Sequence, residues 1–404
     1  MHATDRERSE VHEGPVPFLL RCLQAAVQTG APISPEEWAA ARDWDRVLSL
    51  AEQWRLTPIL HPLYSASGAG LPPDTQERLR SRYYANAARN LHLAERLCEI
   101  VDLFAAKGIR ALPFKGPVMA LQAYGDIALR QFDDLDFLLP QDQIIRGMDT
   151  LVAGGFKPLV ALSIAEREAH VRAGWGCGLV SPGGDFHVEL DASVAPGHFA
   201  FRLPPHLLWE RTASVAIHGR TVPTLATEPL ILLLCAHGAK HVWDRPTWIA
   251  DLAGLIRRQP DIAWPHVLHA ARHAGAARML ELGLLLARDV LRVHLPDPVA
   301  AVMDADREAG RLCAEVDEQM RLYPGVPYTA GAELRFHLRA RERLRDRLRY
   351  LFTLAATPSY SDWKALPLPA GLFPLYYLIR PLRLTGAALC SRKGKQGTGT
   401  DRAP

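Results

Sequence analysis

The pattern of apolar and polar positions divides the chain into a helical start, a mixed middle and a helical second half. Over residues 74–107 apolar side chains recur at spacings of three and four, which places them on one stripe of a long helix. Before it, Ser34-Pro35-Glu36-Glu37 is a capping box, from which a helix is expected to run to about Gln53. The helical period returns after residue 226, with helices expected over residues 227–242, 248–258, 264–274 and 277–293.

In the segment between these stretches, residues 109–225, the helical spacing gives way to short apolar runs and glycine-containing turns. Ile109–Phe114 and Leu135–Leu139 are short apolar runs of strand length. Pro182-Gly183-Gly184 lies between two short strand-like segments, and so does Gly219-Arg220, so two hairpins are expected. The sequence therefore predicts an α+β fold, in which a small mixed β-sheet core is flanked by N-terminal and C-terminal helical domains.

The expected boundaries follow these changes of pattern. They give an N-terminal helical region at 1–108, an α/β core at 109–225, a helical domain at 226–350, an apolar tail at 351–390 and a disordered end at 391–404. Basic residues follow the apolar patch of the tail, so the tail could lie on an anionic membrane surface. Pro374 and Pro381 interrupt a long interfacial helix, and packing on the protein body is therefore the preferred interpretation.

Composition narrows the class of protein. With 404 residues, 48% hydrophobic and 23% charged, the chain has the composition of a soluble globular protein. Its 47 basic and 44 acidic residues balance too closely for bulk attraction to nucleic acid. The longest apolar run, Leu230–Ala236, is too short for a membrane-spanning helix, and residues 1–13 lack the apolar segment of a secretory signal. Six dispersed cysteines without a CxxC pair disfavour a zinc ribbon and favour reduced thiols, so a cytoplasmic location is expected.

Candidate chemistry begins at Asp134-Leu135-Asp136. In a strand, residues two apart share a face, so both carboxylates would project to one side while Leu135 and Phe137 enter the core. Two neighbouring carboxylates repel each other, and a hard divalent cation such as Mg²⁺ or Mn²⁺ relieves that repulsion. A two-metal site for phosphoryl transfer needs this pair and a third acid from a neighbouring strand.

The third acid is expected in the segment Asp185–Asp191, where apolar and ionisable residues alternate. Glu189 is the first candidate because it lies in mid-strand, and Asp191 is the alternative. The same alternation also occurs in ordinary surface strands, and a pair of aspartates two residues apart is common by chance. Other catalytic patterns are missing: the chain has no GxSxG elbow and no GxxxxGK[ST] phosphate loop. The glycine-rich patch around Trp175 is interpreted as a strand edge or bulge.

Several motifs in order resemble one family. These are Lys115-Gly116, Tyr124, Arg130, Asp134-x-Asp136, the acidic strand, the stretch Leu233–Leu252, in which a helix with His237-x-x-Lys240-His241 is followed by a tryptophan and an aspartate, and the tail motifs between Asp362 and Leu384. Together they resemble the nucleotidyltransferases of the DNA polymerase β superfamily, and more narrowly the branch described as uncharacterised nucleotidyltransferase. The resemblance covers roughly residues 80–385.

The resemblance implies a set of metal ligands and catalytic residues. Asp134 and Asp136 would bind Mg²⁺ or Mn²⁺, and Glu189 would be the third catalytic and metal-binding carboxylate, with Asp191 as the alternative. Members of the family usually have aspartate and histidine where this chain has Glu189 and Asp191. The first departure lengthens the ligand by one methylene, which would weaken a second metal. In the wider superfamily a Gly-Ser pair takes the place of Lys115-Gly116.

The resemblance also implies contacts to a nucleoside triphosphate. Gly116 would let the phosphates approach the backbone at a helix N-terminus, and Lys115 would contact a phosphate as a point charge. Arg130 would either orient a carboxylate or contact phosphate. Lys240 and His241 would form a cationic wall over the triphosphate; the alternatives for the histidine pair His237/His241 are structural histidines or a zinc pair. Apart from the resemblance, Asp251 could pair with Lys240 or His241 in a structural role.

The function expected from these residues is Mg²⁺-dependent transfer of a nucleoside monophosphate from an NTP to a small-molecule or peptide acceptor, with release of pyrophosphate. A phosphotransferase that attacks the γ-phosphate would use the same carboxylates. A third interpretation is that the fold has lost catalysis and is retained as a nucleotide-binding or regulatory module. The departures from the family pattern at Glu189 and Asp191 favour this interpretation, and the retained Asp134-x-Asp136 pair opposes it.

Overall fold

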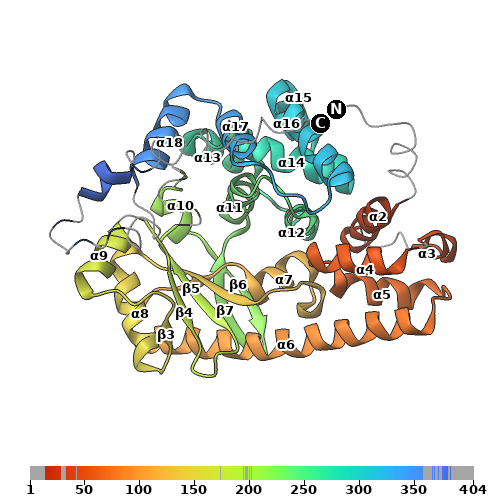
Figure 1. Cartoon of the computed structure of the whole chain (residues 1–404), viewed down its shortest axis with the longest axis horizontal. Helices are drawn as coiled ribbons and strands as arrows, with labels where there is room; N and C mark the ends of the chain where they lie inside the picture. Colours follow the sequence, from red (N-terminus) through yellow and green to blue (C-terminus); the bar gives the residue numbers. More distant parts are fainter. Residues whose placement is uncertain are drawn as a thin grey trace, which may run out of the picture.

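The computed structural model describes residues 14–28, 33–41, 43–172, 174–193, 195, 199, 201, 203–357, 366, 368, 372, 375–380 and 383. Its architecture is α+β, with one mixed five-stranded sheet flanked by helices on both sides, as the sequence predicted. Figure 1 shows the long helix α6 running beneath the strands, with helices α11 to α17 on the opposite side.

The sheet has the strand order β1-β2-β5-β4-β3. Its two central strands, β2 and β5, are parallel, and the three other pairings are antiparallel. A separate hairpin, β6–β7, contacts β1, and the Thr224 hydroxyl donates to the Pro113 carbonyl at 2.7 Å. The strands are β1 (Leu112–Pro113), β2 (Asp134–Leu138), β3 (Lys157–Pro158), β4 (Cys177–Val180), β5 (His187–Asp191), β6 (Thr212–Ile217) and β7 (Arg220–Leu225).

The helices that precede or interrupt the sheet begin at recognisable signals. The long helix α6 starts at Pro73, and α7 starts at Gly116 directly after β1. Proline near the first helical position is favourable because it lacks the amide hydrogen that would be unpaired there. The helices are α2 (Pro15–Val27), α3 (Pro35–Ala40), α4 (Trp44–Gln53), α5 (Thr57–Ser67), α6 (Pro73–Ala106), α7 (Gly116–Tyr124), α8 (Ile144–Ala153), α9 (Ile164–Arg172) and α10 (Pro205–Trp209), with short 3-10 turns η1 (Ile127–Leu129) and η2 (Gln141–Gln143).

The second half of the described chain is helical. Helix α11 is apolar all round and buried at most positions from Pro229 to Ala239, as expected for the central helix of a bundle. The helices are α11 (Thr227–Lys240), α12 (Pro246–Arg258), α13 (Trp264–Ala274), α14 (Ala277–Leu291), α15 (Asp297–Ala305), α16 (Arg307–Leu322), α17 (Ala330–Arg339) and α18 (Leu344–Ala356).

The described residues form two large apolar cores. One lies between α6, α8 and the sheet and includes Phe104, Phe137 and Leu190. The other joins residues from both ends of the chain: α2 packs on α12, α14 and α16. The N-terminal and C-terminal helices therefore share one core, and the sheet lies against it through β1 and α7.

The capping box at Ser34 forms, but the helix it starts ends much earlier than the sequence predicted. Ser34 accepts from the Glu37 amide at 3.2 Å, yet α3 ends at Ala40 and α4 begins separately at Trp44. The physical reason is a second cap, because the Asp43 carboxylate accepts from the Arg46 amide at 3.0 Å.

Only part of the tail lies within the described residues. There, Tyr376 is buried, and its hydroxyl donates to the Leu366 carbonyl at 2.6 Å. Arg380 donates to the Leu354 carbonyl of α18 at 3.1 Å. The expected disordered end at 391–404 lies outside the described residues. In the described part of the chain, no helix has the length and apolar character needed to cross a bilayer.

Candidate functional site

The parallel pairing of β2 and β5 brings the predicted carboxylates together. Asp136 lies opposite Glu189, and Leu138 lies opposite Asp191. Ligand oxygens of Asp136, Glu189 and Asp191 all lie within 4.8 Å of one another. Asp134 is two residues before Asp136 and lines the same cavity, but it is not one of this group of three.

Strand alternation explains why the acids face one side. Leu135, Phe137, Val188 and Leu190 are fully buried between the sheet and its helices. The intervening acids therefore point the other way, toward the helical half of the molecule. Asp136 is 2% exposed, whereas Glu189 is open to the cavity.

The acids form one wall of a cavity of about 530 Å³ between the sheet and the helices α11 and α12. The other walls carry basic and aromatic groups, so the cavity has anionic and cationic sides. Besides the four acids, its lining includes Arg55, Lys115, Arg130, Trp175, Gly176, His237, Lys240, His241, Asp244, Arg245, Trp248 and Asp251.

Lys115 reaches directly into the acidic group. Its Nζ lies 2.8 Å from Oδ1 of Asp136. Burial opposes the charge of Lys115, but the attraction of the Asp136 carboxylate outweighs it and raises the lysine pKa above its ordinary value. The lysine is thus a cation at neutral pH and is held beside the carboxylates.

Gly116 begins α7 immediately after this lysine. Its φ of 53° is left-handed, and a Cβ there would lie 3.3 Å from the carbonyl oxygen of Asp134. Glycine is therefore the residue that lets the start of α7 approach β2 this closely. The first turn of α7 faces the same end of the strand as the acids.

Burial, together with repulsion from neighbouring carboxylates, raises the pKa of Asp134, Glu189 and Asp191. Burial, reinforced by the charge of Glu189, raises the pKa of Asp191 to about 7. Burial and the charge of Asp136 raise the pKa of Glu189 and of Asp134 as well. Each proton that such a group takes up relieves repulsion, and so would a cation placed between the groups.

Arg130 holds a buried carboxylate. Its guanidinium donates from Nε to both oxygens of Asp251 at 3.1 and 3.0 Å, and the Tyr124 hydroxyl donates to the same group at 3.0 Å. Two roles were expected for Arg130, orienting a carboxylate or contacting phosphate. In the structure its side chain contacts the carboxylate of Asp251. The expected partner of Asp251 was wrong: it pairs with Arg130, because α12 packs against α7 and the turn that follows it.

The histidines and lysine of α11 face the cavity. The rings of His237 and His241 lie 4.7 Å apart, and both contact Trp248 at 5.1 Å. Burial lowers the pKa of His241 to about 3 and that of His237 well below its ordinary range, so both rings are neutral at pH 7. Burial and the charge of Lys115 also lower the pKa of Lys240. Of these three side chains, Lys240 therefore supplies the positive charge on the α11 side of the cavity.

Two features of the cavity escaped the sequence interpretation. Gly176, interpreted as part of a strand edge, lies so close to the acids that a Cβ there would be 2.0 Å from Oδ1 of Asp191. After α11, Val242 and Trp243 have φ values of 49° and 53°, an unfavourable left-handed conformation for non-glycine residues. This turn brings Asp244 and Arg245 to the cavity. A glycine next to a strand was the one available signal; nothing in the sequence marks the turn.

Fold and site together define a class: a small mixed sheet whose two parallel central strands present clustered carboxylates, beside a helix N-terminus and opposite the end of the apolar helix α11, where Lys240 lines the cavity. Comparison with models of known families is consistent with that class, and residues 40–292 match the one described as uncharacterised nucleotidyltransferase. The chain belongs to this family. Neither the curated proteins nor the solved structures that were compared gave a match. The tail motifs noted in the sequence lie beyond the matched residues.

Proposed function

We propose that the protein transfers a nucleoside monophosphate from an NTP to an acceptor in a Mg²⁺-dependent reaction. The observation that carries this proposal is the group of three carboxylates on the paired strands β2 and β5, whose ligand oxygens lie within 4.8 Å of one another. Membership of a nucleotidyltransferase family supports nucleotidyl transfer in general.

The donor set suits a hard divalent cation. Asp136, Glu189 and Asp191 offer only oxygen ligands, which Mg²⁺ and Mn²⁺ prefer, and Asp134 adds a further carboxylate at the same cavity. Both Glu189 and the alternative Asp191 belong to the group. A bound cation would neutralise charge on the phosphates and lower the pKa of the attacking hydroxyl.

The remaining residues would bind and orient the triphosphate. Lys115 and Lys240 would supply positive charge on two sides of the cavity. Gly116, which begins α7, is buried and is not among the residues that line the cavity. The pair Arg130–Asp251 fixes α12, and with it one wall of the cavity.

In the proposed reaction, the acceptor hydroxyl oxygen bonds to the α-phosphorus. The bond from that phosphorus to the pyrophosphate oxygen breaks, and the hydroxyl proton passes to a carboxylate. Glu189 suits this role because it is open to the cavity and its pKa is raised. Transfer of the γ-phosphate would use the same groups and would release a nucleoside diphosphate instead.

Calorimetry of the full chain with a non-hydrolysable ATP analogue, with and without Mg²⁺, tests the site. We expect binding that requires Mg²⁺ and weakens at least tenfold in Glu189→Gln and Asp191→Asn. Glu95→Gln removes an exposed carboxylate on α6 and should leave binding unchanged. Equal binding in all variants would place the nucleotide elsewhere. Product analysis then separates the reactions: pyrophosphate supports the proposal, and a nucleoside diphosphate overturns it in favour of phosphotransfer.

A further inference from the structure

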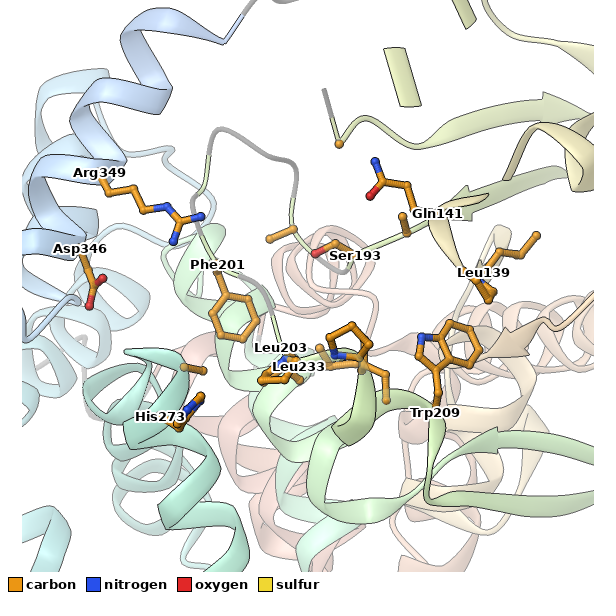
Figure 2. Close-up of a pocket in the computed structure, with 18 of the residues that line it drawn as sticks. Leu139, Gln141, Ser193, Phe201, Leu203, Trp209, Leu233, His273, Asp346 and Arg349 are labelled. Atoms are coloured by element: carbon orange, nitrogen blue, oxygen red, sulfur yellow. The ribbon is translucent and has the colours of Figure 1, made fainter. Parts of the chain in front are cut away.

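A second cavity of about 870 Å³ adjoins the carboxylate site (Figure 2). Its volume lies within the roughly 300–1,000 Å³ typical of pockets for small molecules. Helices α10, α13 and α18, the end of β2 and the segment after β5 contribute to its lining. None of the four acids of the nucleotide cavity lines it.

The two cavities are neighbours. Ser193 lines both, and it follows Asp191 by two residues along the chain. On the same side, the Leu139 amide donates to the Asp191 carbonyl at 2.9 Å, and Leu139 lines the second cavity. On α11, Leu233 lines the second cavity and Leu234 the first. The two cavities therefore share part of one wall, next to the carboxylates of β5.

The middle of this second cavity is apolar. Phe201, Leu203, Leu208 and Trp209 lie along it, and three of them are at least 93% buried. The Arg110 guanidinium lies over the Trp209 ring, 5.0 Å from its centre, and this cation–π contact helps to hold the ring in place. These side chains suit the hydrocarbon or ring body of a ligand.

The end formed by α18 is basic. Arg343, Arg345 and Arg349 line it together with Asp346, and Figure 2 shows Arg349 and Asp346 across the cavity from Leu139 and Trp209. Arg345 lies 3.7 Å from Asp346, and Arg343 donates to the Arg272 carbonyl. Among the described residues Arg349 has no ion-pair partner, and its side chain is exposed. An anionic group would find a charge-assisted partner here.

We propose that this second cavity binds the acceptor, and that the acceptor is an amphipathic molecule with an apolar body and a carboxylate or phosphate at one end. The inference rests on the proposed nucleotidyl transfer. The anionic end would pair with Arg349, the body would lie against Phe201 and Trp209, and a hydroxyl at the other end would pass Ser193 to reach the α-phosphorus. The oxygen of this hydroxyl would bond to the α-phosphorus, the bond from that phosphorus to the pyrophosphate oxygen would break, and the hydroxyl proton would pass to a carboxylate.

Calorimetry of the full chain with three ten-carbon probes tests this inference. Decanoate and decyl phosphate carry the two candidate anions, and decyltrimethylammonium carries the opposite charge on the same chain. We expect both anions, or the one that matches the acceptor, to bind, and the cation to bind at least tenfold more weakly. Arg349→Glu should weaken anion binding at least tenfold. Arg335→Glu makes the same charge change on an exposed arginine of α17 outside the cavity and should have no effect.

Three outcomes would overturn the inference: no binding of either anion, equal binding of the cation, or equal loss in Arg349→Glu and Arg335→Glu. A second variant, Phe201→Ala, should weaken binding of both anions alike, because it shortens the apolar wall. Binding of the Mg²⁺–nucleotide complex to the unaltered protein is measured separately. Its absence would refute nucleotidyl transfer and the acceptor role with it, whereas nucleotide binding without probe binding would refute the second cavity alone.

Discussion

At the scale of single residues, the carboxylate group depends on a position that has no side chain. Gly176 leaves room for Asp191 to lie beside Asp136 and Glu189, since a Cβ would be 2.0 Å from an Asp191 oxygen. Real Cβ atoms do not come this close, so any larger residue must displace the carboxylate.

We expect Gly176→Ala to weaken Mg²⁺ binding at least tenfold while the chain remains folded. Isothermal calorimetry with MgCl₂ measures the affinity, and circular dichroism checks the fold. Gly310→Ala is the control: a Cβ at this exposed position of α16 meets no atom within 4 Å. It should leave Mg²⁺ affinity unchanged and stabilise the protein by about 0.5–1 kcal/mol through helix propensity. Unchanged Mg²⁺ affinity in Gly176→Ala would remove Asp191 from the ligand set.

At the scale of elements, a buried ion pair joins α12 to the chain that follows α7. Asp251 and Arg130 have side chains 2% and 15% exposed, and Tyr124 adds a hydrogen bond. Removing one charge from such a pair leaves the other largely buried and without compensation.

Asp251→Asn should therefore cost about 3–5 kcal/mol of unfolding free energy. The double variant Arg130→Met/Asp251→Leu should be less destabilised than the single one, because it buries no lone charge. Urea denaturation measures both. Asp149→Asn breaks the Arg167–Asp149 pair, whose aspartate is 58% exposed, and should cost under about 1 kcal/mol. If Asp251→Asn lost no more unfolding free energy than the control Asp149→Asn, the Arg130–Asp251 pair would not stabilise the contact between α12 and the chain after α7.

Between α14 and the chain around α16, Glu281 gives the stability of the protein a pH dependence that does not come from the carboxylate site. It is 9% exposed, and burial, with the nearby charges of Asp306 and Glu342, raises its pKa to about 7 although Arg278 opposes the shift. The folded chain therefore binds this proton more tightly than the unfolded chain does. Its contribution to stability is present in acid and is lost as the pH rises from about 4.5 to 7.

We expect Glu281→Gln to be more stable than the unaltered protein above pH 7, by up to about 3 kcal/mol, and to flatten the pH dependence of stability below it. Thermal unfolding at pH values from 5 to 8 measures this. Glu318→Gln, an exposed glutamate of α16, should leave the profile unchanged. Parallel profiles for Glu281→Gln and the unaltered protein would contradict the assignment.

The elements also show what sequence patterns can predict. Helix α13 has the predicted bounds, and both hairpins form where glycine-containing turns indicated them. Strand alternation predicted that Asp134 and Asp136 would share one face of their strand, and that Glu189 and Asp191 would share one face of another. It could not show that both Glu189 and Asp191 would lie beside Asp136, because that depends on the pairing of β2 with β5 and on the space left by Gly176. The partner of Asp251 was missed for the same reason, since contacts between distant segments leave no periodic signal.

At the scale of the whole molecule, the matched family region contains only part of the core that α2 shares with α12, α14 and α16. Residues 40–292 exclude α2, whose Leu19, Leu20 and Leu23 are buried, and α16, which packs on α14. The cut would expose apolar faces of α12 and α14 to water.

A fragment of residues 40–292 is therefore expected to lack cooperative unfolding and to bind an apolar dye. Thermal circular dichroism and dye fluorescence measure these properties. A chain of residues 14–404 keeps both ends of the shared core and should unfold like the full protein. If the shorter fragment instead unfolded cooperatively at the temperature of the full chain, the packing of α2 on the later helices would contribute little.

The arginines of α18 lie beyond residues 40–292, whereas the carboxylates of β2 and β5 lie within them. Only the arginine end of the second cavity lies outside the matched region, because the apolar part of its lining lies within it. Under the proposed acceptor role, changes in α18 alone would alter which anionic group is accepted and leave the carboxylates of β2 and β5 in place. Relatives compared over the matched region would then be grouped by their carboxylate site and not by the anion they accept.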